Sequence, residues 1–396
     1  MAAAPATRIQ SVDVLRGIVM VIMALDHIRD FFHYDSQLFS PEDLAKTSAA
    51  LFFTRWVTHF CAPVFVLLAG TGAYLATRRG MSRRATATFL LSRGLWLVVV
   101  EMTFVLVGGG FNVSYRFVIW QVIWAIGWSM VALSALIFLP WRVLLAFSLL
   151  MIAGHNALDG ISSDQLGSFG WLWKILHEGF KPVALPGGVV AFVIYPLIPW
   201  IGVMSAGYCL GRVFDLAPEV RQRVLFQLGV ALTAAFVVLR FLNGYGDPAA
   251  WSPQASPVMT MLSFLRVSKY PPSLLFLLMT LGPALIALGA MDRMTVGKHN
   301  PLLVFGRVPL FYYVLHWYLL HLTALVFAWW RYGRVDFMFG FPPALAIFPS
   351  SYPAGYGYSL GVTYLVWIAI VAMLYPLCRW FADVKTRKRA PILSYL

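Results

Sequence analysis

The first apolar segment of the chain carries its densest group of ionisable residues. His27, Asp30 and His33 follow one another at intervals of three residues, so their side chains lie on one stripe of an α-helix. An imidazole oriented by a carboxylate is a common general base near neutral pH. A charged helix end in contact with lipid headgroups is the alternative explanation. The pattern favours a catalytic group formed by His27, His33, Asp30 and the preceding Asp26.

Three arginines are expected at the cytoplasmic ends of their helices, in the orientation derived below. Arg16, Arg93 and Arg307 lie in the first, third and ninth predicted membrane helices. Guanidinium groups that converge there would bind the phosphates of a donor, although each could instead pair with a nearby acid or a helix C-terminus. Gln121 of the fourth helix is added to this donor-binding group. Asp13 and Arg16, three residues apart, are expected to form a structural ion pair.

Four further residues are expected at the outer ends of their helices, where an acceptor would bind. His59 opens the second predicted helix and should approach His27. Lys269 and Tyr270 precede the eighth helix, and His316 lies in the outer half of the ninth. No HxxxH or HExxH pattern occurs, so a metal site is not expected.

The composition indicates a protein embedded in lipid. Hydrophobic residues make up 60% of the 396 residues and charged residues 12%, with a mean hydropathy of +0.76. Soluble domains carry about 25% charged residues. The net charge of +14 comes from short basic runs between apolar segments, which indicates membrane topology and not nucleic-acid binding.

Stretches of about 20 apolar residues predict an all-α, polytopic integral membrane protein with about ten transmembrane helices in a single domain, residues 1–396. The predicted helices lie near residues 12–32, 56–77, 86–108, 117–138, 143–158, 188–210, 224–242, 271–290, 302–327 and 358–378.

Lys and Arg are more frequent in the short segments on one side of these helices than in the longer loops on the other. Because positive residues are retained in the cytoplasm, both termini are expected inside (N-in/C-in), in a multi-pass protein of the cell (inner) membrane. The expected outer loops are residues 33–55, 159–187, 243–270 and 328–357. In the first of them, Ser40 followed by proline and two acids predicts the start of a short helix.

Three motifs resemble the heparan-alpha-glucosaminide N-acetyltransferase-like membrane proteins, part of a wider superfamily of transmembrane acyltransferases. They are residues 8–17 (RIQSVDVLRG), 195–202 (YPLIPWIG) and 306–312 (GRVPLFY), and the resemblance covers essentially the whole chain. It implies that acyl-CoA binds from the cytoplasm as a donor substrate, that no cofactor is bound permanently, and that the acyl group reaches an outward-facing acceptor such as an envelope sugar or glycan.

The superfamily also has a pattern for the base. In its type 3 branch an arginine is followed 11 residues later by an essential histidine, and Arg16 and His27 match these positions. The lysosomal branch has an asparagine in place of His27 and a functional histidine in the following loop, for which His33 is the nearest match. The resemblance therefore favours His27 and leaves His33 as the second candidate.

The sequence thus predicts a membrane-bound acyltransferase that moves an acyl, most simply an acetyl, group to a hydroxyl or amino acceptor. Direct transfer and an acyl-histidine intermediate both remain open, as do acyl chain length and assembly, for which a homodimer is one option. A multipass transporter or flippase of a small envelope metabolite is the alternative, since polar residues in membrane helices also line transport pathways. The lack of an internal repeat disfavours that alternative.

Overall fold

Long apolar helices make up most of the structure, a computed structural model that describes residues 9–78, 80–340, 352–388 and 393. Arg8, Arg79 and Arg389, used in the orientation argument, and residues 341–351 of the last expected outer loop lie outside the described residues. The helices are α1 (Gln10–Phe32), α2 (Ala49–Trp56), α3 (Cys61–Arg78), α4 (Arg83–Val100), α5 (Leu106–Gly110), α6 (Val122–Leu136), α7 (Trp141–Gly154), α8 (Gly170–Trp173), α9 (Leu197–Leu210), α10 (Pro218–Leu242), α11 (Pro257–Leu265), α12 (Leu274–Met291), α13 (Pro301–Arg307), α14 (Pro309–Tyr332) and α15 (Leu360–Lys388).

Eight helical segments within the described residues are long and apolar enough to cross a membrane. They are Ala49–Arg78, Arg83–Gly110, Trp141–Leu158, Leu197–Asp215, Pro218–Leu242, Leu274–Met291, Pro309–Tyr332 and Leu360–Lys388. This confirms a mostly helical, multi-pass membrane protein. Helix α1 is 23 residues long but carries five charged side chains, and α6 has only 15 residues. The count of ten spans and the N-in/C-in orientation therefore stay predictions.

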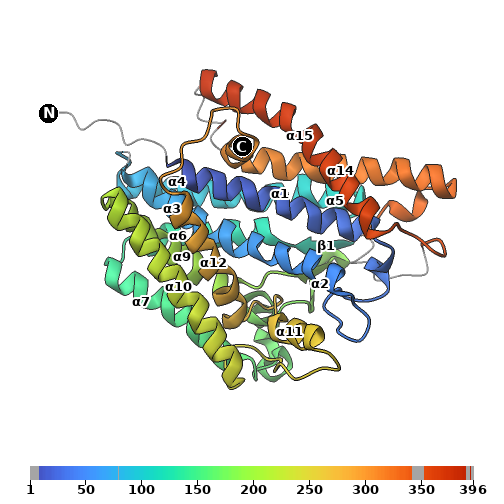
Figure 1. Cartoon of the computed structure of the whole chain (residues 1–396), viewed down its shortest axis with the longest axis horizontal. Helices are drawn as coiled ribbons and strands as arrows, with labels where there is room; N and C mark the ends of the chain where they lie inside the picture. Colours follow the sequence, from blue (N-terminus) through green and yellow to red (C-terminus); the bar gives the residue numbers. More distant parts are fainter. Residues whose placement is uncertain (1–8, 79, 341–351, 389–392, 394–396) are drawn as a thin grey trace.

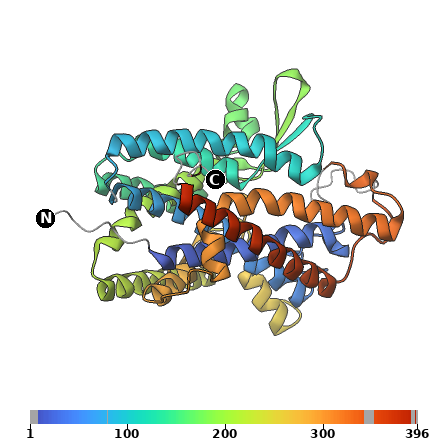
Figure 2. The same ribbon diagram turned by 90° about the horizontal axis from the view of Figure 1, so that it is seen from above.

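A small sheet departs from the all-α prediction. Strands β1 (Phe117–Trp120), β2 (Pro182–Ala184) and β3 (Val190–Val193) form a sheet in the order β1-β3-β2, with β1 parallel and β2 antiparallel to β3. Figure 2 shows β2 and β3, in light green, at one margin of the helical body. The predicted helices 117–138 and 188–210 were wrong at their starts, because β-branched and aromatic residues at these starts pair as strands.

Two other predicted elements differ from the structure. The predicted helix 302–327 is divided into α13 and α14, because Val308 has φ −130° and ψ 50° and the next residue, Pro309, lacks the N–H needed to continue a helix. The short helix expected at Ser40 is also absent. Residues 40–47 form turns, and the helix begins at Ala49, where the Ser48 side chain accepts a hydrogen bond from the N–H of Leu51.

Helix α1 occupies the centre of the molecule and positions most of the predicted site. Figure 1 shows it between α14 and α15 on one side and α3 and α12 on the other, and all four contact it. Its closest approach is to α13, where a Cβ atom on Gly17 would lie 1.8 Å from the carbonyl oxygen of Leu302, and one on Gly306 would lie 1.7 Å from that of Asp13. Only glycine allows this spacing, so the two motif glycines fix how α1 and α13 pack.

Candidate active site

Two cavities lie along α1, and the first brings together the three arginines of the predicted donor site. This arginine cavity has a volume of about 370 Å³ and is lined by Arg16, Arg93 and Arg307, together with Asp13 and Lys385. These residues come from α1, α4, α13 and α15. Arg16 donates hydrogen bonds to Asp13 Oδ1 at 3.2 Å and to the carbonyl oxygen of Gly306 at 3.3 Å. The close packing of α1 on α13 therefore sets the position of Arg16.

Small side chains of α3 form part of the wall of the arginine cavity. Ala69, Gly72, Ala73 and Ala76 line it from successive turns of that helix. A Cβ on Gly72 would lie 4.0 Å from Arg16 Nη2. These small residues therefore add little bulk beside the guanidinium group of Arg16.

The second cavity is called the ion-pair cavity because equal numbers of acidic and basic side chains line it. Its volume is about 410 Å³. The charged lining residues are Asp26, Asp30, Glu42, Arg29, Arg55 and Lys269. Aromatic side chains complete the wall, namely Phe31, Phe39, Phe65, Phe180, Tyr195, Tyr270 and Trp317.

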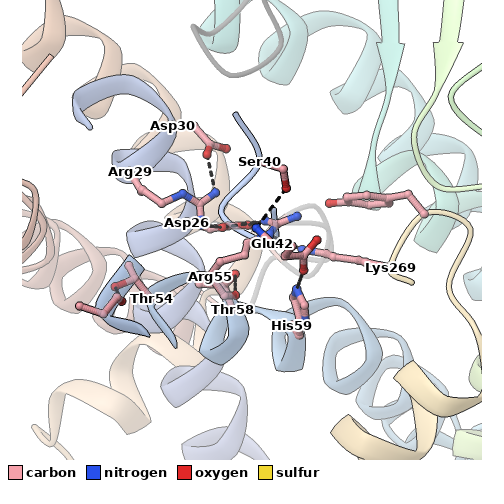
Figure 3. A network of polar contacts seen from close by, with 12 residues as sticks. Asp26, Arg29, Asp30, Ser40, Glu42, Thr54, Arg55, Thr58, His59 and Lys269 are labelled. Atoms are coloured by element: carbon pink, nitrogen blue, oxygen red, sulfur yellow. Dashed lines mark hydrogen bonds and ion pairs between the residues drawn. The ribbon is translucent and has the colours of Figure 1, made fainter. Parts of the chain in front are cut away.

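Asp26 is the centre of the charge network in this cavity (Figure 3). Nη1 of Arg55 donates to its two carboxylate oxygens at 2.8 and 2.6 Å. Arg29 Nη1 lies 2.8 Å from Asp26 Oδ1, and Lys269 Nζ lies 3.7 Å from Oδ2. Arg29 also donates to Asp30 Oδ1 at 2.5 Å. The acids predicted to orient a histidine are thus paired with cations.

Glu42 and His59 form a separate pair at the rim of the same cavity. His59 Nε2 lies 2.7 Å from Glu42 Oε1, and the imidazole is buried against the ring of Phe276. Burial raises the pKa of the Glu42 carboxyl, but His59 and Arg55 outweigh it and lower the pKa to about 2. His59 therefore holds the loop carboxylate of Glu42 in the cavity wall. Among the described residues no ring contact joins His59 to His27, which the sequence predicted it would approach.

His27 lies on the wall of the ion-pair cavity among aromatic rings. Its ring centroid is 4.2 Å from that of Trp317 and 5.3 Å from that of His316. No hydrogen bond within the described part of the chain joins it to Asp30, which pairs with Arg29, so the orientation of this imidazole by a carboxylate stays a prediction. The neighbouring His316 has its Nδ1 hydrogen-bonded to the carbonyl oxygen of Tyr313. Because a carbonyl oxygen can only accept, Nδ1 carries the proton and donates it.

His33 lies outside the cavity lining. Its Nδ1 accepts from the N–H of Asp35 at 3.2 Å, its ring stacks on Tyr34, and its backbone pairs with Tyr358. Burial and the nearby Arg29 lower the pKa of His33 to about 4. These contacts describe a residue that anchors the chain after α1.

Gln121 was grouped with the donor-binding arginines but lines the ion-pair cavity. The reason is the strand at residues 117–120, after which α6 begins only at Val122 with Gln121 as its N-cap. Lys269 and Tyr270 line the ion-pair cavity; both precede α12, which begins at Leu274.

The two cavities meet at Phe65 and Val122, which line both of them. The same helices contribute consecutive turns on either side of this junction. On α1, Met20 faces the arginine cavity and Met23 the ion-pair cavity, and on α14 the corresponding residues are Tyr313 and Trp317. The two cavities therefore adjoin along α1 and α14, with the arginines on one side of Phe65 and Val122 and the ion pairs on the other.

Sequence reasoning missed several lining residues as site candidates. Glu42, Arg55 and Lys385 were considered only as loop or topology residues, and Tyr313 and Trp317 only as neighbours of His316. The spacing of Trp317 from Tyr313, four residues apart on one helix face, was the one signal available. Arg55 and Glu42 offered none, because their partners are distant in sequence.

The chain was also compared with known proteins. No curated protein matches it. A family model described as heparan-alpha-glucosaminide N-acetyltransferase, catalytic, matches residues 8–242. The match runs from α1 to the end of α10 and includes Arg16, His27 and Arg93, whereas Arg307 and His316 lie beyond it. Because the match covers more than half of the chain, this membrane protein belongs to the heparan-alpha-glucosaminide N-acetyltransferase catalytic family.

Proposed function

We propose that the chain transfers an acetyl group from acetyl-CoA in the arginine cavity to an acceptor in the ion-pair cavity. The observation that carries the proposal is the junction of the two cavities at Phe65 and Val122, beside which His27 lines the ion-pair cavity. Family membership supports acetyl transfer as the chemistry. In this proposal the arginine end faces the cytoplasm and the ion-pair end faces outward across the cell inner membrane.

The arginine cavity suits a phosphorylated donor. Arg16, Arg93, Arg307 and Lys385 supply four cations against the single acid Asp13, and guanidinium groups form strong, charge-assisted hydrogen bonds to phosphate. The rest of the lining is mostly apolar and includes Met20, Leu68 and Leu310. Because burying an unpaired charge is costly, the phosphates stay at the arginine end and the thioester extends toward Phe65.

The ion-pair cavity suits a polar acceptor such as an envelope sugar or glycan. Its acids and bases are already paired with one another, as Asp26 is with Arg55, so they offer hydrogen-bonding atoms without an excess of charge. Tyr270 and Trp317 add aromatic rings, and each ring carries one polar group, a hydroxyl or an indole N–H. An amine acceptor is the simplest choice for a member of an N-acetyltransferase family.

His27 is the proposed general base. It has no carboxylate hydrogen-bonded to it among the described residues, and its ring lies against those of Trp317 and His316. A neutral imidazole at the junction takes the proton from the acceptor as its nitrogen or oxygen attacks the thioester carbonyl. The C–S bond then breaks, and the proton passes from His27 to the departing CoA thiolate.

The test is acetyl-CoA turnover by the purified full-length protein in nanodiscs with D-glucosamine as the acceptor. We expect release of the CoA thiol and formation of N-acetylglucosamine, with His27→Ala reducing kcat by roughly 10²- to 10⁴-fold and the matched His33→Ala change leaving it intact. Arg93→Ala should raise the KM for acetyl-CoA. Replacing glucosamine with N-acetylglucosamine, which offers only hydroxyls, distinguishes an amine from a hydroxyl acceptor.

Each contrary outcome has a distinct meaning. Loss of activity only in His33→Ala would make the residue after α1 the base and refute the role of His27. If acetyl-CoA neither binds nor releases thiol, the donor assignment is wrong. Uptake of a solute into proteoliposomes without thiol release would instead identify a transporter.

A further inference from the structure

Two buried hydrogen-bond donors lie at the junction of the cavities without an acceptor. The hydroxyl group of Tyr313 and the indole Nε1 of Trp317 are both inaccessible to solvent, and neither has a hydrogen-bond partner within the described residues. Tyr313 is 3% exposed and Trp317 is 2% exposed. Buried polar groups without partners are uncommon in native proteins, and each one costs stability. Two such donors beside a cavity are available to an acceptor atom that a ligand supplies.

Tyr313 and Trp317 lie where the arginine cavity and the ion-pair cavity adjoin. Tyr313 lines the arginine cavity, Trp317 lines the ion-pair cavity, and Val122 lines both. The two side chains are one turn apart on α14, and the indole N–H lies close to the phenolic oxygen. The two side chains thus belong to adjoining parts of the two cavity walls, with their polar atoms buried behind them.

The general base proposed above lies against the same pair. The ring centroid of His27 is 4.2 Å from that of Trp317, and the ring of His316 is 5.3 Å from both His27 and Tyr313. Side chains that could act on the two sides of one carbonyl are therefore adjacent, with the imidazole on the acceptor side and the donors on α14.

We infer that the Tyr313 hydroxyl and the Trp317 indole N–H bind the carbonyl oxygen of the acyl group and stabilise the oxyanion during transfer. This inference rests on the proposed acetyl transfer and adds two residues to it. When the acceptor attacks, the carbonyl π electrons move to the oxygen, which receives the two hydrogen bonds. The C–S bond then breaks, the carbonyl re-forms, and the proton taken by His27 goes to the CoA thiolate. Donors aimed at a developing oxyanion in a site shielded from water are among the strongest catalytic contributions.

Removal of one hydroxyl tests the inference, and the chain offers a matched control. Tyr313→Phe deletes the donor and keeps the ring. Tyr312→Phe deletes the hydroxyl of the neighbouring tyrosine, which is equally buried and also lacks a hydrogen-bond partner among the described residues but lines neither cavity. We expect Tyr313→Phe to lower kcat with acetyl-CoA and glucosamine by roughly 10²- to 10³-fold with little change in KM, and Tyr312→Phe to retain the wild-type kcat.

A spectroscopic measurement separates this inference from the proposed function. The infrared carbonyl band of acetyl-CoA labelled with ¹³C at the acetyl carbonyl is recorded in the bound state, without acceptor, for wild type, Tyr313→Phe, Trp317→Phe and Tyr312→Phe. Loss of a hydrogen bond moves the band to higher frequency, so we expect that shift in Tyr313→Phe and Trp317→Phe and not in Tyr312→Phe.

The outcomes are decisive in either direction. An unchanged band and unchanged kcat in Tyr313→Phe would overturn the inference even if wild type transfers acetyl groups. If wild type does not turn over, the proposed function fails, while the band still decides whether these two donors contact the carbonyl. A band that shifts equally in Tyr312→Phe would also overturn it, because the effect would then be a general one on packing.

Discussion

The contact between α1 and α13 gives a sharp prediction, because a single methyl group cannot be added there. In Gly17→Ala the new Cβ would lie 1.8 Å from the carbonyl oxygen of Leu302. Nonbonded carbon and oxygen atoms approach to about 3.3 Å, so the two helices must separate by about 1.5 Å. Gly306→Ala demands a similar separation, since its Cβ would lie 1.7 Å from the carbonyl oxygen of Asp13.

The expected consequences follow from that displacement. Overpacking of a helix contact costs about 1–3 kcal/mol, offset in part by the roughly 1 kcal/mol that alanine gains over glycine in a helix. The separation also breaks the hydrogen bond from Arg16 to the carbonyl oxygen of Gly306, which measures 3.3 Å, and moves Arg307 away from Arg16. A misplacement of about 1 Å can cost roughly 100-fold in rate, so acetyl-CoA binding and turnover should fall further than stability.

The assay compares Gly17→Ala and Gly306→Ala with Gly154→Ala in nanodiscs. Gly154 ends α7, and its added Cβ would make only an ordinary 3.6 Å contact with Leu150. Thermal unfolding followed by tryptophan fluorescence and calorimetric titration with acetyl-CoA measure the two effects. Wild-type stability and affinity in Gly17→Ala would refute the close packing of α1 on α13 and its role in positioning Arg16.

Three further predictions concern the ion-pair cavity and its surroundings. Asp26→Asn should lower the free energy of unfolding by about 3–5 kcal/mol, because it leaves buried cations without their counterion. The loss should be smaller when Arg55→Met is already present. Additive losses of the two changes in denaturant unfolding would contradict the pairing of Asp26 with Arg55. The pKa of His33 is lowered to about 4 from an unfolded value of 6.5, so its contribution to stability is present above pH 6.5 and lost as the pH falls toward 4. Thermal unfolding of His33→Asn should therefore show a smaller loss of stability between pH 6.5 and 4 than wild type. Identical pH profiles of the two proteins would refute this role of His33. The pKa of Glu42 is lowered to about 2 from 4.5, so its contribution to stability is present above pH 4.5 and lost as the pH falls toward 2. Glu42→Gln should remove this contribution and speed hydrogen exchange of the loop after α1 at pH 7. Unchanged exchange would rule out an anchoring role for the contact between Glu42 and His59.

Much of the fold could be predicted from apolar stretches, because a bilayer requires about 20 such residues for each crossing. The strands at residues 117–120 and 190–193 could not, since a short apolar run has no periodicity that distinguishes a strand from a buried helix. The break between α13 and α14 at Val308 could not be predicted either. Pro309 marks a possible helix start as readily as an interruption, and only the packing of α13 on α1 decides between them.

Parts of the candidate site were also predictable. An arginine followed 11 residues later by a histidine, Arg16 and His27, is a property of the sequence, and so is the convergence of polar residues on α1. The partners of these residues are not. Spacing along a helix predicted that Asp30 would orient a histidine, but Asp30 pairs with Arg29, and Asp26 pairs with Arg55, which enters from α2.

The sequence by itself determined that this protein crosses the membrane several times, which family it belongs to, and which helix carries the most polar side chains. These properties depend on local hydropathy and on short motifs. Only the tertiary structure decided that Arg16, Arg93, Arg307 and Lys385 share one cavity and that a second cavity meets it at Phe65 and Val122. The physical reason is that helical periodicity fixes the face on which a side chain lies, whereas the helix that covers that face is chosen by contacts such as Arg16 with Gly306, which are 290 residues apart in the chain.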